Sequence, residues 1–198
     1  MPQKCAAGHY CVEGTKTNNG TPCEAGKYQP EEGRIACLAC PPGYYCDTPG
    51  KTTIVTADKC TKGYYCKGNS KTPTPVDGIV GAICPIGYYC DEGVAFPKKC
   101  PPGFACDSQG MDYDAVLDKP CVAGHYCLEK AITTQPTDSN QGGNRCPAGF
   151  YCPNPDTNAP TRTKSDGVTT VKGGAEAPYP CPPGKYRSTT DAALATDC

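Results

Sequence analysis

The chain has 198 residues, of which 18 are cysteine, 23 glycine and 22 proline, and it contains no tryptophan. Leu, Ile, Val and Phe together number 22, too few for a conventional hydrophobic core in a chain of this length. The 19 basic and 20 acidic residues nearly cancel, which removes an electrostatic reason to bind nucleic acid or anionic lipid. This composition argues against a compact globular enzyme.

The cysteine content indicates where the protein works. Eighteen cysteines in a chain so poor in aliphatic residues predict nine disulfides, formed in an oxidising environment, and hence an extracellular or cell-surface location. No apolar leader follows Met1, so we expect a processed chain or, preferably, a segment of a longer protein. No uncharged run reaches the ~18 residues of a membrane span, so we expect no membrane insertion by this segment.

Nine copies of the motif Cys-x-x-Gly-x-[Tyr/Ala] follow one another along the chain. In seven short motifs a second cysteine comes next, whereas the long motifs beginning at Cys23 and Cys181 delay it to Cys37 and Cys198. We predict a small disulfide-rich fold: an elongated tandem array of short β or irregular modules with little helix and no conventional core. The expected repeats are 1–22, 23–39 (long form), 40–59, 60–83, 84–99, 100–120, 121–145, 146–180 (with a long linker) and 181–198 (long form).

Each motif position has a physical interpretation. Gly at the fourth position predicts a turn with positive φ or a close backbone approach, and Pro at the second or third position favours the same turn. Tyr at the sixth position would cover the disulfide of a module too small for a normal interior. The alternative is an exposed ladder of aromatic rings that binds sugars or a neighbouring subunit.

Between the motifs we expect two short strands, over Thr52–Thr56 and Gly167–Val171, where β-branched residues cluster. No window repeats apolar residues at helical spacing, so helix should be scarce.

Two disulfide schemes compete. In the interlocked scheme short motifs exchange partners, as in Cys40–Cys60 with Cys46–Cys66, which leaves Cys5 and Cys11 without partners in the chain. Loop entropy mildly favours this scheme, whereas the count of cysteines favours the local scheme, in which each motif closes on itself. The local bonds are Cys5–Cys11, Cys23–Cys37, Cys40–Cys46, Cys60–Cys66, Cys84–Cys90, Cys100–Cys106, Cys121–Cys127, Cys146–Cys152 and Cys181–Cys198.

Catalytic and metal-binding patterns are weak. The two histidines, His9 and His125, occupy a motif position that other repeats fill with Tyr, Phe or Lys, so packing explains them better than catalysis. Cys-x-x-Cys occurs once, at Cys37 and Cys40, whereas structural zinc sites normally need two such pairs. We therefore predict no catalytic residue, no metal and no cofactor.

Glycosylation is better supported by the sequence. Asn19-Gly20-Thr21 is an N-glycosylation sequon in a loop. Thr and Pro cluster in the linkers, which suits O-glycosylation, although Thr also simply favours extended chain. The O-glycosylation candidates are Thr72, Thr74, Thr134, Thr137, Thr161 and Thr163.

The motifs CPPGYYC, CPAGFYC and CEAGKY resemble the ephrin-receptor-like cysteine-rich repeats, which are related in style to tumour necrosis factor receptor modules. Their long form, Cys-x-x-Gly-x-Tyr…Cys-x-x-Cys, matches residues 23–40 and, to the end of the chain, 181–198. The resemblance implies a disulfide-stapled extracellular array, as in surface proteins of protists, and implies no reaction.

Two functions follow from these observations. The first is an extracellular structural repeat protein that forms or coats a fibre or a cell surface, carries glycans and assembles head to tail with copies of itself. The second is a receptor or adhesion ectodomain that presents one face to a ligand. Near-zero net charge and the tandem array favour the first, because neutral modules stack without repulsion.

The modular interpretation makes a prediction about size. A compact globule of this length would have a radius of gyration of roughly 16 Å. Modules that contact mainly their neighbours should give a clearly larger value in small-angle X-ray scattering. A measured value at the compact figure would show that the repeats fold back on one another.

Overall fold

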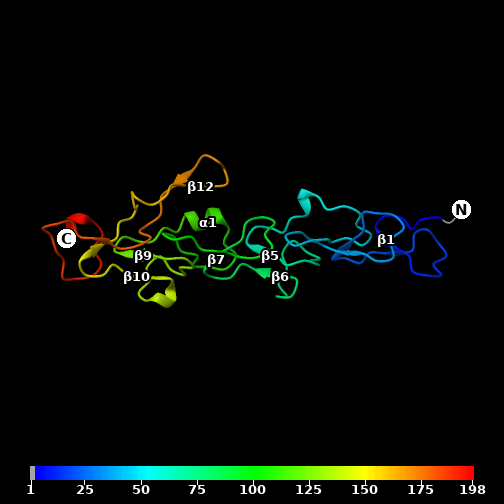
Figure 1. Ribbon diagram of the computed structural model, residues 1–198, viewed down its shortest axis with the longest axis horizontal. Helices are drawn as coiled ribbons and strands as arrows, with labels where there is room; N and C mark the ends of the chain where they lie inside the picture. Colours follow the sequence, from blue (N-terminus) through cyan, green and yellow to red (C-terminus); the bar gives the residue numbers. More distant parts are fainter. Residues whose placement is uncertain (1–2) are drawn as a thin grey trace. The chain divides into compact units, whose positions relative to one another are not determined.

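The computed structural model describes residues 3–198 (Figure 1). By their internal contacts these residues form two compact units. Unit 1 extends to Ile83 and also takes in Cys90–Pro97. Unit 2 comprises Cys84–Tyr89 and Lys98–Cys198. We number the modules 1 to 9 after the nine motifs.

Regular structure consists of strands of two or three residues, paired antiparallel in twos. The pairs of unit 1 are β1 (His9–Tyr10) with β2 (Thr21–Pro22), β3 (Lys27–Tyr28) with β4 (Leu38–Ala39), and β5 (Tyr64–Cys66) with β6 (Gly81–Ile83). The pairs of unit 2 are β7 (Tyr88–Tyr89) with β8 (Lys98–Lys99), β9 (His125–Cys127) with β10 (Gly143–Arg145), β11 (Phe150–Tyr151) with β14 (Tyr179–Pro180), and β12 (Arg162–Thr163) with β13 (Thr170–Val171). The helical segments are η1 (Thr56–Asp58), α1 (Tyr113–Leu117), η2 (Ser139–Gln141) and η3 (Ala195–Asp197). The expected class, a small disulfide-rich array with little helix, is confirmed.

The disulfides follow the local scheme, and the interlocked alternative is wrong. Eight bonds close Cys5–Cys11, Cys23–Cys37, Cys40–Cys46, Cys60–Cys66, Cys100–Cys106, Cys121–Cys127, Cys146–Cys152 and Cys181–Cys198. Cys84 and Cys90 are disulfide-bonded as well, so no cysteine in residues 3–198 is free. Each bond therefore staples one turn of chain, and other forces must join one module to the next.

Backbone hydrogen bonds supply that junction. The motif glycine of one module donates its N–H to the carbonyl at the seventh motif position of the next module. That position is the second cysteine of a short motif, and Gln29 or Arg187 in the long ones. The bonds are Gly8–Gln29, Gly26–Cys46, Gly43–Cys66 and Gly63–Cys90 in unit 1, and Gly87–Cys106, Gly103–Cys127, Gly124–Cys152 and Gly149–Arg187 in unit 2, all 2.7 to 3.0 Å long.

The carbonyl of the same glycine accepts a second bond, from the N–H of the next module's first cysteine. These bonds are Cys23–Gly8, Cys40–Gly26 and Cys60–Gly43 in unit 1, and Cys100–Gly87, Cys121–Gly103, Cys146–Gly124 and Cys181–Gly149 in unit 2. Because the glycine is the donor in one bond and the acceptor in the other, it fixes how consecutive modules join.

A residue in the left-handed conformation, three or four places after the seventh motif position, makes a third bond. Its N–H donates to the carbonyl of the first cysteine of the preceding module. We call it the left-handed linker residue. The set is Gly33, Gly50, Asn69, Gly93, Gly110, Lys130 and Asp191, with φ between 55° and 74°.

The motif glycines also lie against the module two places further on. All nine have φ between 79° and 91°, which confirms the positive φ expected from the sequence. A Cβ on Gly8, Gly26 or Gly43 would lie 2.2 to 2.6 Å from the carbonyl oxygen of the left-handed linker residue two modules later. In unit 2 the corresponding distances at Gly87 and Gly124 are 3.1 and 2.9 Å. Each of these modules is therefore packed against the next two.

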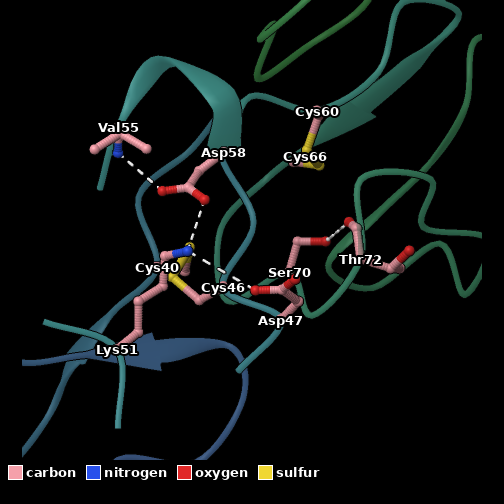
Figure 2. The surroundings of a disulfide bond; sticks show 10 residues. All are labelled: Cys40, Cys46, Asp47, Lys51, Val55, Asp58, Cys60, Cys66, Ser70 and Thr72. Carbon is pink, nitrogen blue, oxygen red and sulfur yellow. Dashed lines mark hydrogen bonds and ion pairs between the residues drawn. A yellow bond between two sulfur atoms is a disulfide. The ribbon is translucent and has the colours of Figure 1, made fainter. Parts of the chain in front are cut away.

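The strand expected over Thr52–Thr56 is wrong, because a carboxylate organises that segment instead. The Asp58 carboxylate accepts hydrogen bonds from Lys51 Nζ at 2.6 Å and from the Val55 N–H at 2.8 Å (Figure 2). The chain therefore turns into η1 rather than pairing. Partial burial favours a higher pKa for Asp58, but these two donors outweigh it and hold the pKa below its usual range.

In unit 2 the expected strand over Gly167–Val171 is present only as β13, and the helix α1 has no counterpart among the expected elements. Asp112 caps α1 by accepting a hydrogen bond from the Ala115 N–H at 2.9 Å. Val116 and Leu117 are fully buried, in a cluster with Phe104, Met111 and the cysteines of module 6. This small apolar cluster supports the surface described below.

The contact at the motif glycine can be tested in module 3. In Gly43→Ala the new methyl would meet the Gly93 carbonyl at 2.3 Å, whereas the equally left-handed Gly78 has nothing within 4 Å of its Cβ position. Gly78→Ala should cost about 1 kcal/mol, and Gly43→Ala about 3 kcal/mol more, because packed backbone must move. Hydrogen exchange at the Cys60 N–H, which bonds Gly43, measures the difference. Equal protection in the two variants would refute close packing at this glycine.

Candidate interaction surface

Module 8 departs from the repeat in the chain between Cys152 and Cys181. The Asp156 N–H donates to the Gly173 carbonyl at 2.9 Å, so residues 157–172 form an excursion that leaves and rejoins the module at one point. Within it, β12 and β13 pair in the register Arg162 with Val171 and Thr163 with Thr170. The hairpin stands out from the other strands of unit 2 (Figure 1).

A buried carboxylate holds the base of this excursion. The Asp156 side chain is fully buried and accepts hydrogen bonds from the Tyr179 hydroxyl at 2.7 Å and from the Asn158 N–H at 2.9 Å. The Tyr179 ring packs on Tyr151, with centroids 5.6 Å apart. Burial and the hydrogen bond to Asp156 raise the pKa of Tyr179 to about 12. The neutral phenol therefore keeps its proton at any physiological pH.

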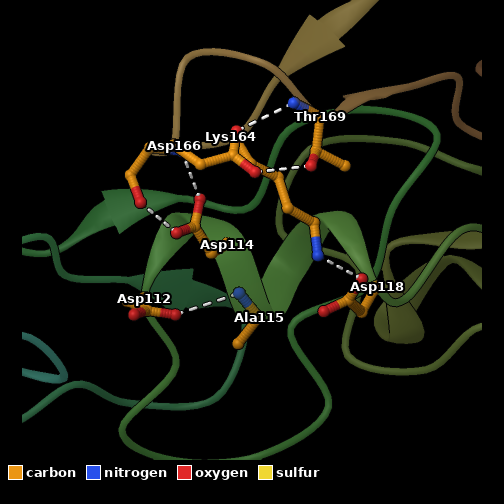
Figure 3. A network of polar contacts seen from close by, with 8 residues as sticks. Asp112, Asp114, Ala115, Asp118, Lys164, Asp166 and Thr169 are labelled. Carbon is orange, nitrogen blue, oxygen red and sulfur yellow. Dashed lines mark hydrogen bonds and ion pairs between the residues drawn. The ribbon is translucent and has the colours of Figure 1, made fainter.

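The hairpin is also fixed to α1, which belongs to the linker of module 6. Lys164 Nζ lies 2.5 Å from Asp118 (Figure 3). The Ser165 N–H donates to Asp114 at 2.8 Å, and the Ser165 hydroxyl bonds the same carboxylate. The contact to Asp118 raises the pKa of Lys164. These contacts join the β12–β13 hairpin to α1, and neither segment is part of the repeated motif.

A second set of contacts lies nearer the base. Arg162 lies 3.3 Å from Glu176 and 5.6 Å from the centroid of the Phe104 ring. A guanidinium over an aromatic face gains a cation–π attraction in addition to the ion pair. The hairpin is thus attached at the tip, along one strand and at the base.

The tip itself is a preformed turn. Asp166 accepts hydrogen bonds from the Val168 N–H, the Thr169 N–H and the Thr169 hydroxyl at 2.9, 2.8 and 2.5 Å. These donors, the Thr169 hydroxyl first, lower the pKa of Asp166 and keep it ionised. Gly167 has a φ of 71°, and Val168 is 81% exposed. The turn therefore displays an apolar side chain without needing a partner to order it.

Unit 1 carries a different surface, at the long-form module 2. An open cavity of about 320 Å³ is lined by Gln29, Glu31, Arg34, Ile35, Ala36 and Leu38. Gln29, which stands at the seventh motif position, is buried and spans the loop: its amide donates to the Ala36 carbonyl and accepts from the Glu31 N–H. Ile35 is 76% exposed beside it. The long form thus keeps its disulfide, Cys23–Cys37, but closes a longer loop with it, and that loop displays an apolar residue.

The predicted modification sites lie in separate places on the two units. Asn19, Thr72, Thr137, Thr161 and Thr163 are exposed, whereas Thr74 and Thr134 are half-buried. Pro75, which follows Thr74, is fully buried, and so is Pro136, which lies two residues after Thr134. Those two Thr-Pro linkers are therefore packed parts of their modules rather than free spacers.

The other candidate groups are dispersed. His9 lies in β1 of unit 1 and His125 in β9 of unit 2, and both are half-buried. The motif tyrosines at the sixth position are half-buried as well, apart from Tyr186. Within residues 3–198, no group of three His, Cys, Asp or Glu side chains is arranged to hold a metal ion. None of the helices in that range is long and apolar enough to cross a membrane.

Comparison with known families gives one match. Residues 8–56 match the family described as tyrosine-protein kinase ephrin type A/B receptor-like. That segment is similar to ephrin-receptor-like cysteine-rich regions, as the motifs indicate, and the tandem disulfides fit cysteine-rich repeats of this kind. No curated protein matches the chain. The disulfides and this match together indicate an extracellular location.

The Asp156–Tyr179 contact should control the order of the hairpin. Tyr179→Phe leaves the buried carboxylate one donor short, so we expect exchange of the hairpin amides in β12 and β13 to rise by about tenfold. Tyr151→Phe is the matched control, because it keeps its ring against Tyr179 and the Asp156 contact intact. Similar exchange in both variants would show that the hydroxyl does not hold the hairpin.

The same contact predicts a pH dependence. The folded-state pKa of Tyr179 is raised to about 12 from an ordinary value near 10. Its stabilising effect is thus complete below pH 10 and is lost as pH rises through about 12. Ultraviolet titration should show one tyrosine ionising after the others, and that step should be absent in Tyr179→Phe.

Proposed function

We propose that this chain is a structural element of an extracellular fibre or surface coat, built as a disulfide-stapled array that carries glycans. The observation that carries the proposal is the repeated backbone junction, in which motif glycines bond the next module and lie against the one after it. Such a junction depends on backbone geometry and tolerates variation in side chains. It suits a protein selected for continuity along its length rather than for one binding pocket.

Glycans fit this role. Asn19 is exposed at the tip of a turn in module 1, and its sequon residue Thr21 is exposed in β2. Thr72, Thr137, Thr161 and Thr163 are exposed in four separate linker positions. Sugars attached there would leave the buried cysteines and motif glycines untouched.

The alternative function is a receptor or adhesion ectodomain, and the hairpin of module 8 favours it. A rigid turn with an exposed Val168, fixed to α1 by charged contacts, has the form of a recognition element. The family match of residues 8–56 supports the same reading. In this case Val168 and its neighbours would contact a ligand.

Imaging of native material separates the two functions. Gold-labelled antibodies against the chain should decorate continuous fibres or a coat at repeated intervals in negative-stain micrographs of unpermeabilised cells. Isolated, unconnected particles on the membrane would overturn the structural proposal and favour the receptor. Val168→Asp provides the second arm: fibres should survive it, whereas a ligand-binding ectodomain should lose cell adhesion.

A further inference from the structure

The two long-form modules differ from the short ones in the residue that serves the junction. In a short motif the second cysteine stands at the seventh position, so its carbonyl accepts the N–H of the preceding motif glycine, as Cys46 does for Gly26. In module 2 this place belongs to Gln29, whose carbonyl accepts the Gly8 N–H at 2.7 Å. The bonded cysteine, Cys37, comes later in the chain. One end of the long-form disulfide therefore lies outside the junction.

A hydrogen bond from the seventh-position side chain holds the long loop beside its disulfide, and we call this bond the clamp. In module 2, Gln29 Nε2 donates to the carbonyl of Ala36, the residue before the second cysteine, at 2.8 Å. In module 9 the same position is Arg187, which donates to the carbonyl of Asp197, again the residue before the second cysteine, at 3.2 Å. After that cysteine, β4 pairs with β3 in module 2. The loop is thus held on both sides of its second cysteine by contacts that do not involve sulfur.

Cys37 is also the accessible end of its disulfide. Its partner Cys23 is fully buried, as are all the cysteines of modules 3 to 8, whereas Cys37 is half-buried. Cys11, Cys181 and Cys198 are half-buried too, but they lie in the first and last modules, so their exposure would change with any further module. Of the cysteines in modules 2 to 8, Cys37 is therefore the one that solvent reaches.

The exposure of Cys37 belongs to its place in the repeat. Cys37 stands directly before β4, and Pro97 and Pro178 take the same place before β8 and β14. Both prolines are half-buried, although modules 5 and 8 each follow two or more modules. Motif glycines lie against the next module and the one after it, so these two places already have the neighbours that precede them in the array. Cys37 therefore stays accessible in a longer array as well.

We propose that Cys23–Cys37 is a site of thiol–disulfide exchange, at which a thiolate of another molecule becomes covalently attached to Cys37. The thiolate attacks Sγ of Cys37 and forms a mixed disulfide as the bond to Cys23 breaks. Cys23 leaves as the thiolate and takes up a proton from water, because burial favours the neutral thiol. One sulfur–sulfur bond forms and one breaks, so the step needs no oxidant.

The array tolerates this exchange because the junction remains. Cys23 takes part in the junction through its backbone: its N–H donates to the Gly8 carbonyl at 2.9 Å, and its carbonyl accepts the Gly50 N–H at 2.7 Å. Neither bond involves its sulfur, and the clamp at Gln29 keeps the loop in place. Opening a short-form bond would instead free the residue that accepts the N–H of the preceding glycine. The exchange site is independent of the choice between a structural element and a receptor ectodomain.

The first test follows exchange in the disulfide-intact chain of residues 1–198. Reduced glutathione is titrated from about 0.1 to 10 mM, the reaction is quenched with acid, and the denatured chain is alkylated with N-ethylmaleimide and mapped by mass spectrometry. We expect glutathione on Cys37 and alkylation on Cys23. Both should appear at a concentration at least about tenfold below the one that opens Cys40–Cys46 in the next module.

The same mapping of native material distinguishes the sources of the thiol. An adduct of low mass on Cys37 identifies a small thiol, and a peptide of another chain cross-linked to Cys37 identifies a protein thiol. Either product supports the exchange site.

Two matched double variants test whether the junction survives without the disulfide. The long-form variant is Cys23→Ser/Cys37→Ser, and the short-form variant is Cys40→Ser/Cys46→Ser. In each, the readout is hydrogen exchange at the N–H of the motif glycine that donates to the seventh-position carbonyl of the altered module.

The two readout amides are those of Gly8 and Gly26. Protection of the Gly8 N–H in the long-form variant should stay within about threefold of the wild type, whereas protection of the Gly26 N–H in the short-form variant should fall at least about tenfold. Adding Gln29→Ala to the long-form variant should remove the protection at Gly8, because the loop then loses the clamp as well. Glu32→Ala, at an exposed position of the same loop, is the control for that addition.

Three results overturn the inference. Cys23–Cys37 may open only at the glutathione concentration that opens Cys40–Cys46, which would show that the long-form bond is not the exchange site. Glutathione attached to Cys23 instead of Cys37 would contradict the assigned point of attack. Loss of protection at Gly8 in the long-form variant would show that the disulfide, and not the clamp, holds the junction of module 2.

Discussion

The absence of a side chain at one motif position is the constraint on which the array depends. The motif glycine donates to the next module, accepts from its first cysteine and lies under the backbone of the module after that. A Cβ would occupy the space of that second backbone, and the positive φ would itself be strained. One residue therefore combines the turn that closes a module with the contact that joins three of them.

Disulfides and backbone bonds divide the work between them. Most of the disulfides span six residues, and each closes a short loop that restricts the unfolded chain only modestly. Such bonds define the modules without connecting them. The connection comes from main-chain donors and acceptors, whose geometry is independent of the side chains present. This arrangement explains how 22 large aliphatic and Phe residues suffice for 198 residues: in the part of the chain that the structure describes, cysteines make up most of the buried hydrophobic residues.

Much of the architecture could be predicted because the residues that determine it recur in every motif. The nine motifs, the positive φ of their glycines and the disulfide-rich class all follow from local chemistry. The choice between the local and the interlocked disulfide schemes does not follow from local chemistry, because it depends on distances that the sequence leaves open. The left-handed linker residue was also missed, because its place is taken by Asn69, Lys130 and Asp191 as well as by glycine. Three side-chain types at one position hide a backbone requirement that all of them meet.

Contacts between a single side chain and a partner outside the repeated motif could not be predicted from the sequence, because no repeated pattern marks them. Asp58 accepts a hydrogen bond from the Val55 N–H, and the β-branched segment around Val55 does not pair as a strand. The helix α1 is stabilised because its apolar residues pack in a cluster with Phe104. The excursion of module 8 shows how such features enter an array without breaking it. Asp156 and Gly173 close the added chain at its base, after which Ala175 accepts the Cys127 N–H, as Ser70 accepts that of Cys46. The two bonds of Gly124, to Cys146 and Cys152, are kept. A linker can therefore gain a recognition element while these backbone bonds between modules remain. Variation between repeats therefore belongs in the linkers, and continuity in the glycines and cysteines.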